Sequence, residues 1–388
     1  HTWLNFLKLR ASWGRVGNNN VANYQYLAPL VFDASYTFGG VLGNGEDNKG
    51  YIQNGGYPSR LGNEKVKWET SEQTNVGIDA RFLDTRLEFN FDFYIKTTKD
   101  WLVQAPILST AGTAGPIING GNVKNTGVEL NLQWRDNIGK VNYWIGANAA
   151  YNHNRVGSIP TEDGIIHGAT GQLWNNSEEF YRSENGHEIG YFWGYKTAGI
   201  FQNQKEIDDW IAAGNGVLQA NPQPGDVKYV DINHDGRIST DDRVDLGSGI
   251  PDWTFGINLG FEWNGFDFSA VANGTAGAEI VQAYRSIDNP KANYDSKILG
   301  RWTGEGTSNK IPRVTTSTEN WQFSDLYVHD ADFLRISNIT IGYDFAKLLK
   351  WKYISRARLY FQIQNLHTFT KYDGMDPEVG ASPSAHSW

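Results

Sequence analysis

Cysteine is absent from the 388 residues of this chain, and methionine occurs only once. Without cysteine the chain can hold no disulfide, no thiolate metal site and no catalytic thiol. Long apolar runs are also missing: no stretch approaches the roughly 20 apolar residues of a membrane-spanning helix, and the mean hydropathy is −0.51. Positive charge is in deficit, since the net charge is −9. This balance argues against a nucleic-acid partner, which requires a basic surface.

Aromatic residues and glycine are abundant: aromatics make up 14 % of the chain, and there are 43 glycines. Both favour strands and turns over helices. Apolar and polar residues alternate in at least nine runs, as expected of strands with two different faces. The run 252–263 has an apolar face of Trp253, Phe255, Ile257, Leu259, Phe261 and Trp263. The nine runs cover residues 7–13, 74–82, 87–97, 125–135, 141–154, 252–263, 266–275, 331–345 and 357–370.

The length of these runs separates two all-β architectures. Strands of soluble sandwiches average about 5–6 residues, whereas these runs often reach about 9–12, the length that crosses a bilayer at a tilt. Trp253 and Trp263 share one apolar face ten residues apart. At about 3.3 Å per residue and a tilt near 40° they lie roughly 25 Å apart along the membrane normal, the height of the lipid-facing band between two aromatic girdles. The spacing favours a transmembrane barrel.

The connections between the runs alternate in length. Short or medium turns are expected at Asp84–Arg86, Asp136–Lys140, Asn264-Gly265 and Lys347–Ser355, and long loops at 98–124, 156–250 and 276–330. Asn-Gly between two alternating runs is a strong hairpin signal. Outer-membrane barrels have short periplasmic turns and long extracellular loops. We therefore predict an all-β, antiparallel transmembrane β-barrel segment with long extracellular loops, the longest at 156–250.

The same assignment predicts which side chains face a wet lumen. Runs 87–97, 141–154, 266–275 and 357–370 then point outward from the cell, and the intervening runs point inward. The residues expected in the lumen are Glu88, Asp92, Glu129, Asn131, Asn148, Asn258, Glu262, Arg358 and Gln362. Ordinary solvation of the lumen is the simplest role for each of them.

One segment has the spacing of a calcium loop. From Asp231 the sequence reads D-I-N-H-D-G-R-I-S-T-D-D, the twelve-residue pattern whose side chains supply hard oxygen ligands. Gly236 would form the sharp turn at position 6. The expected structural Ca²⁺ ligands are Asp231, Asn233, Asp235, the Arg237 carbonyl, Ser239 and Asp242.

This loop departs from a full EF-hand in two respects. Position 12 is Asp242 where the motif has Glu, and the preceding Lys-Tyr-Val is extended in pattern where an EF-hand has a helix. We interpret it as a lone structural calcium loop that rigidifies an extracellular excursion. The alternative is an acidic, solvated turn.

Other motifs indicate packing and not catalysis. Asn203 followed by Glu206 predicts the start of a helix, and Gly214 predicts its end. The apolar stripe of this helix would consist of Ile207, Trp210 and Ile211. G-x-S-x-G, P-loop and dinucleotide motifs are missing, and the His-Glu at 187–188 lacks the second histidine of a zinc protease. We expect no enzyme.

The loop tryptophans offer surfaces for sugars, but packing inside the loops is the expected role of Trp174, Trp193, Trp210, Trp302 and Trp321.

Several phrases resemble the SusC-like branch of TonB-dependent transporters, in family order along the whole chain. They are FLKLRASWGRVGN (6–18), NEKVKWETSEQTNVGID (63–79), NGGNVKNTGVEL (119–130), IGYFWGYKTAGIFQ (189–202), GDVKYVDINHDGRISTDD (225–242), RWTGEGTSNKIPR (301–313), DFLRISNITIGYDF (332–345) and QNLHTFTKYDGMDPE (364–378).

The resemblance implies a 22-stranded outer-membrane barrel that imports glycan or peptide oligomers. It also implies a SusD-like surface lipoprotein as partner and energy from the TonB–ExbB–ExbD complex. A plug domain, which in this family carries gating, has no counterpart in residues 1–388, and the ending GASPSAHSW is loop-like. We therefore expect the C-terminal part of the barrel, about the last third to two-fifths of such a transporter, with its substrate site on the long loops at the extracellular mouth.

Two other functions stay open at this level. The strands would also suit a complete small barrel, either a passive porin or an adhesin. A soluble calcium-dependent glycan-binding β-protein would show the same alternation. The missing upstream sequence separates the first from an active transporter, because only the latter carries a plug. Purification separates the second, because a soluble protein should stay monodisperse without detergent.

Overall fold

The nine alternating runs form one antiparallel sheet. The computed structural model describes residues 3–19, 22–38, 51–105, 107, 109–174, 177–283, 295–349 and 353–379, so the predicted loop-like end at 380–388 lies outside the described residues. The strand order is β1-β4-β5-β8-β9-β16-β17-β20-β21. The strands are β1 (Leu4–Asn18), β4 (Glu69–Phe82), β5 (Leu87–Lys99), β8 (Asn122–Ile138), β9 (Val141–Ser158), β16 (Trp253–Trp263), β17 (Phe266–Ala276), β20 (Phe333–Asp344) and β21 (Arg358–Thr370). All nine predicted strands are confirmed.

The register places the predicted apolar and polar sets on opposite faces of the sheet. Phe91 of β5 lies opposite Ile78 on one side and Leu130 on the other. On β16, Trp253, Ile257 and Trp263 are 44 %, 43 % and 51 % exposed, and Trp253 packs on Tyr151 with ring centroids 5.0 Å apart. This apolar face has no covering layer in the described chain, as expected of a surface that meets lipid.

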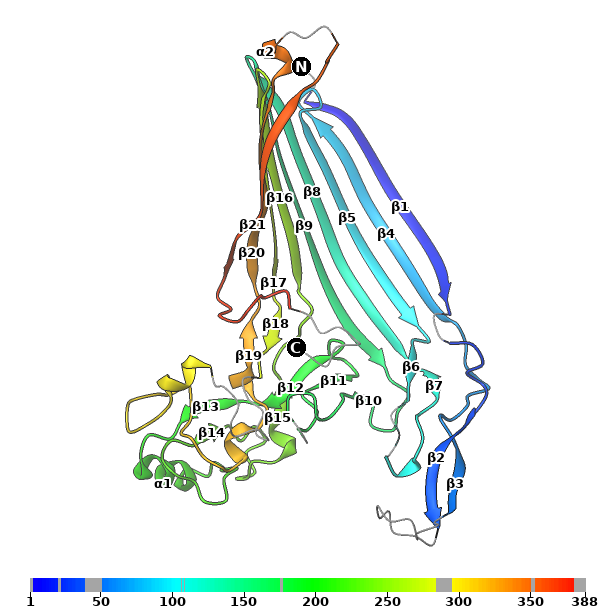
Figure 1. The fold of residues 1–388 in the computed structure, drawn as a ribbon, viewed down its shortest axis with the longest axis vertical. Coiled ribbons are helices and arrows are strands. Elements are labelled where there is room, and N and C mark those ends of the chain that lie inside the picture. Colours follow the sequence, from blue (N-terminus) through cyan, green and yellow to red (C-terminus); the bar gives the residue numbers. More distant parts are fainter. Residues whose placement is uncertain are drawn as a thin grey trace.

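The short turns gather at one end of the sheet and the long connections at the other, as Figure 1 shows. At the short end, Asn264 (φ 50°) and Gly265 (φ 91°) join β16 to β17. Two successive left-handed residues are what a two-residue hairpin turn requires. The short helix α2 (Ala346–Leu349) lies at the same end.

The long connections carry small sheets and short helices of their own. The two-stranded sheets are β2–β3 (Leu30–Phe38, Tyr51–Pro58), β6–β7 (Leu102–Gln104, Ile117–Asn119), β13–β14 (Thr197–Ile200, Val227–Tyr229) and β18–β19 (Glu279–Val281, Val328–Asp330). A four-stranded sheet contains β10 (Ile165–His167), β11 (Tyr181–Glu184), β12 (Tyr191–Tyr195) and β15 (Arg243–Asp245). The helices are α1 (Gln204–Ala212) and the 3₁₀ turns η1 (Ser109–Ala111), η2 (Thr240–Asp242), η3 (Ser296–Gly300), η4 (Glu319–Trp321) and η5 (Asp325–Tyr327).

The two longest connections fold together as one body with a hydrophobic core. Phe180 and Phe192 come from the connection 156–250, and they pack against Val281, Phe323 and Tyr327 of the connection 276–330. A second cluster contains Tyr195, Val227, Tyr229 and Ile238. We call the described residues of 156–250 and 276–330 the excursion body. It stands at the long-loop end of the sheet, next to β9, β16 and β17 (Figure 1).

Helix α1 confirms the predicted helix start and corrects its packing face. The Asn203 side chain accepts a hydrogen bond from the Glu206 backbone N–H at 2.9 Å, which satisfies one of the free donors of the first turn. Ile207 is buried, but Ile211 is 47 % exposed, so the predicted stripe is wrong at that position. A helix of two turns presents only a narrow strip to its support, and Ile207 and Trp210 fill it.

Candidate functional site

The polar face of the sheet carries an ion-pair network across β1, β4 and β5. The Arg10 guanidinium donates through Nε to Asp79 Oδ2 at 2.9 Å and through Nη2 to Asp92 Oδ2 at 2.8 Å. Asn90 donates to the other Asp79 oxygen at 2.9 Å. Charge-assisted hydrogen bonds of this kind are stronger than neutral ones, so the network fixes the relative positions of three strands.

A glycine makes this network possible. Gly77 lies opposite both Arg10 and Asp92 in the register, and a Cβ there would lie 2.4 Å from the Asp92 carboxylate. The bare backbone of the middle strand lets the Arg10 side chain cross it. The same device recurs at Gly342, over which Arg358 reaches Asp267 at 2.6 and 2.8 Å.

Every residue predicted to face the lumen lies on this polar face. In the strand register Asp92 lies opposite Glu129, and Asn131 lies opposite Asn148. These four residues line one hollow of the polar face together with Arg10, Asn90 and Thr254. The register carries the same face to Glu88, Asn258, Glu262 and Gln362. Sequence reasoning missed Arg10, Asp79 and Asp267, although their alternation with apolar neighbours was a signal for their face.

The calcium-type loop folds as a tight turn in the excursion body. Asp231 accepts hydrogen bonds from the backbone N–H groups of Asp235 at 3.3 Å and Gly236 at 2.7 Å. Gly236 has a φ of 82°, the left-handed turn that position 6 requires. Asp242 accepts from Ile232 at 2.9 Å, so both ends of the loop are tied together.

The two ends of this loop are buried, whereas residues 232–237 between them are exposed. Asp231 and Asp242 are 2 % and 0 % exposed, although both carry carboxylates. Asp235 accepts from the Arg237 N–H at 2.8 Å, and the Ser239 hydroxyl caps the turn η2 by accepting from Asp241 N–H at 3.1 Å. Within the described chain, the three carboxylates of the predicted ligand set, Asp231, Asp235 and Asp242, do not all lie within 4.8 Å of one another. The donor set consists of oxygen only, which is the chemistry of a hard cation.

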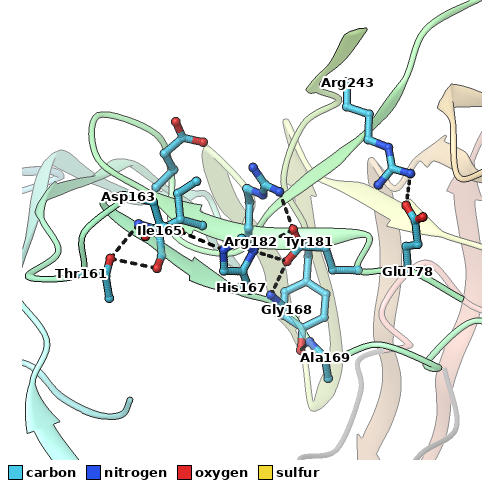
Figure 2. Close-up of polar contacts among 12 residues, drawn as sticks. Thr161, Asp163, Ile165, His167, Gly168, Ala169, Glu178, Tyr181, Arg182 and Arg243 are labelled. Atoms are coloured by element: carbon cyan, nitrogen blue, oxygen red, sulfur yellow. Dashed lines mark hydrogen bonds and ion pairs between the residues drawn. The ribbon is translucent and has the colours of Figure 1, made fainter. Parts of the chain in front are cut away.

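A charged cluster at the β10–β11 pair holds the excursion body together (Figure 2). His167 contacts Glu179 through Nδ1 at 2.9 Å and Asp163 through Nε2 at 3.1 Å. Arg182 forms an ion pair with Glu179, and Arg243 forms one with Glu178. Burial lowers the pKa of His167, but the hydrogen bonds to Glu179 and Asp163 outweigh it and hold that pKa above its ordinary value.

The five loop tryptophans are all half-buried and packed. Arg182 and Arg243 stack on Trp193, with 3.2 and 4.8 Å from guanidinium carbon to ring centroid. Trp174 and Trp321 pack on the Phe180 cluster. Trp210 packs against Phe201, and the Trp302 ring lies against Gly225. The expected packing role is therefore confirmed for all five.

Known proteins match nearly the whole chain. The family model described as "TonB dependent receptor-like, beta-barrel" matches residues 2–366. "TonB-dependent receptor P3" of Formosa agariphila is 30 % identical over 382 residues, which cover 97 % of this chain and 36 % of that protein. "TonB-dependent receptor SusC" of Bacteroides thetaiotaomicron is 27 % identical, over 99 % of this chain and 36 % of that protein.

Solved structures match the same fold. A chain of the RagAB peptide transporter superimposes with a TM-score of 0.75 and 25 % identity, over 98 % of this chain and 39 % of that one. The superposition includes the excursion body as well as the nine strands, because it leaves only 2 % of the chain uncovered. The chain thus spans less than two-fifths of the length of these relatives. None of the helices in the described ranges is long and apolar enough to cross a membrane.

Proposed function

Since this chain belongs to the family of TonB-dependent receptor-like β-barrels, it lies in the outer membrane as part of an antiparallel barrel, and we propose that the barrel imports oligomeric nutrients, glycans or peptides. The soluble alternative is therefore wrong. The observation that carries the proposal is the match to the RagAB peptide transporter over 98 % of the chain. A transporter of this kind moves its substrate without chemical conversion.

The two faces of the sheet support this role. The apolar face of β16 and its neighbours meets lipid. The polar face, with Arg10, Asp92 and Glu129, then lines the lumen and surrounds whatever fills it. We propose that substrate first meets the excursion body, because it stands at the long-loop end of the sheet (Figure 1), and long loops of outer-membrane barrels are extracellular.

Two partners belong to the proposal. We expect a SusD-like surface lipoprotein to cover the mouth of the barrel, and the TonB–ExbB–ExbD complex to supply energy from the inner membrane. The similarity to SusC and to RagAB supports both. Purification of the full-length transporter from its native outer membrane should recover a lipoprotein in a stable complex. Recovery of the transporter alone, under several mild detergents, would contradict the first expectation.

Uptake in the native bacterium tests the function. A strain that lacks the full-length gene should lose uptake of one class of labelled oligomer, either peptides or oligosaccharides, and a strain that lacks TonB should lose the same class. The gene restored in full length should return it. Uptake that persists without TonB would instead indicate a passive porin.

A structural calcium ion in the excursion body is also part of the proposal. Asp231, Asn233, Asp235, Ser239 and Asp242, with the Arg237 carbonyl, would surround it with oxygens at about 2.3–2.6 Å. Buried carboxylates repel one another unless a cation or donors offset their charge. The buried pair Asp231 and Asp242, tied together through backbone donors, supports this site.

Matched variants of the full-length transporter test the calcium ion. Asp231→Asn should weaken Ca²⁺ binding about tenfold or more, because position 1 donates directly. Asp241→Asn removes a neighbouring carboxylate that is exposed and outside the ligand set, so binding should be unchanged. Calorimetry with Ca²⁺ measures both. Equal binding by the two variants and the wild type would refute the site while leaving the transport proposal intact.

A further inference from the structure

A second cleft lies where the excursion body meets the sheet. It has a volume of about 430 Å³. Its lining comes from β9, from the β11–β12 connection, from β15 and the segment that leads from it into β16, and from the start of β18 with the residue Gly277 before it. The charged residues that line it are His153, Arg155, His187, Glu188, Asp245, Asp252 and Glu279. Four carboxylates therefore share the cleft with one arginine, and that arginine forms no ion pair with a described residue.

Three of these side chains converge on one point. The ligand atoms of His153, Glu188 and Asp252 all lie within 4.8 Å of one another. His153 Nδ1 is 3.4 Å from a Glu188 carboxylate oxygen. At a tetrahedral zinc ion with bonds of about 2.0–2.2 Å, neighbouring ligand atoms lie about 3.3–3.6 Å apart. The His153–Glu188 distance thus already matches one edge of such a site, and an Asp252 oxygen lies within 4.8 Å of both of these ligand atoms.

The other carboxylates of the cleft already have partners. Asp245 contacts His187 at 3.1 Å and accepts from the Gly247 N–H at 2.9 Å. Glu279 accepts from the Ser248 N–H at 2.8 Å. Glu188 also bonds the Ser248 side chain, but a carboxylate has about four acceptor sites, so it retains oxygen lone pairs for an ion beside His153. One imidazole and two carboxylates suit a borderline divalent cation better than calcium, which takes oxygen ligands.

We propose that His153, Glu188 and Asp252 bind a divalent transition-metal ion such as Zn²⁺. The three ligands are far apart in sequence: His153 lies on β9, Glu188 in the connection between β11 and β12, and Asp252 directly before β16. The ion therefore clamps the excursion body to two neighbouring strands of the barrel. His153 lies two residues beyond Tyr151, the partner of Trp253 in the outer aromatic girdle, so the ion sits outside the membrane.

Zinc titration of the purified full-length transporter tests the site. The protein is prepared in detergent with a histidine-free tag, stripped with chelator and titrated with Zn²⁺ alone in a calorimeter. His153→Asn and Asp252→Asn should each weaken binding about tenfold or more. His234→Asn removes an imidazole from the calcium-type loop instead, and asparagine tolerates its left-handed backbone (φ 59°). That control should bind zinc as the wild type does.

A spectroscopic measurement on the wild-type protein needs no variant to fold. X-ray absorption at the zinc edge should show one imidazole and only nitrogen and oxygen ligands at about 2.0–2.2 Å. Zinc should also slow amide exchange in the β11–β12 connection of the wild type and of His234→Asn, but not in His153→Asn or Asp252→Asn. Unaltered zinc binding in both ligand variants would overturn the proposal. A zinc site without an imidazole ligand would overturn it as well.

Discussion

The assignment of faces on β16 is tested by arginine at two adjacent positions. Ile257 and Asn258 lie at nearly the same depth: from Trp253 to Trp263 the strand rises about 33 Å, or about 25 Å along the membrane normal at a tilt near 40°. Ile257 is then about 10 Å and Asn258 about 13 Å below the outer girdle. Their side chains point to opposite faces, so depth is held constant while the environment changes.

The structure sets the expected magnitudes. Ile257 is 43 % exposed on the apolar face, between Ala147 and Ala272, where an arginine near the midplane costs about 2–4 kcal/mol. Asn258 lines a polar hollow together with Glu262, and it lies opposite Gly146, which leaves room for a longer side chain. Asn258→Arg should therefore change the free energy of unfolding by less than about 1 kcal/mol.

Equilibrium unfolding of the full-length transporter in lipid vesicles, followed by tryptophan fluorescence during guanidinium titration, measures both variants. Ile257→Ala is the control for lost bulk, so that the difference between Ile257→Arg and Ile257→Ala isolates the charge. Similar losses for Ile257→Arg and Asn258→Arg would refute the assignment of faces. A larger loss at Asn258 would reverse it.

Three further predictions follow from local geometry. Gly77→Ala should lower the free energy of unfolding by about 1 kcal/mol, because the added methyl displaces the ion pair that crosses Gly77. Gly14→Ala is the control and should leave that free energy unchanged, because a Cβ at Gly14 would have no neighbour within 4 Å. Equal effects of the two variants would contradict this. The raised pKa of His167 means that its ion pairs stabilise the excursion body fully below pH 6.5 and are lost as pH rises through the raised value. Amide exchange should then accelerate with pH beyond its intrinsic rate, and His167→Gln should abolish that excess; an unchanged excess would exclude the histidine. Asn203→Ala should destabilise α1 by about 1 kcal/mol, which amide exchange at residues 206–212 measures. Gln204→Ala is a near-neutral control, and comparable losses in the two variants would contradict the role of Asn203 as the cap.

The strands and their faces could be predicted from sequence because their signals are local. Side chains alternate with a period of two, so Trp253, Ile257 and Trp263 mark one face without knowledge of any neighbour. Asn264-Gly265 fixes the hairpin between β16 and β17, and thereby the register of that pair. The helix cap at Asn203 is equally local, since its side chain bonds a backbone group three residues away.

The excursion body was beyond sequence reasoning, because its core joins distant segments. Phe180 and Phe192 have no periodic neighbours that show what they bury, and their partners Phe323 and Tyr327 follow more than 100 residues later. The exposed Ile211 shows the converse: its spacing suits a buried stripe, but no described segment of the chain covers it. Apolar character is a local property, whereas burial depends on what the rest of the chain brings into contact.

The sequence by itself determined the fold class and the two faces of the strands, and it was enough to propose the calcium-type loop, whose proposed ligands all lie within twelve residues. Only the tertiary structure decided the contacts between residues far apart in sequence. Arg10 meets Asp92 across 82 residues, and His153, Glu188 and Asp252 meet across almost a hundred. The physical reason is the range of the interactions: alternation, turns and caps act between near neighbours, whereas ion pairs and metal ligands require a geometry that only the assembled sheet provides.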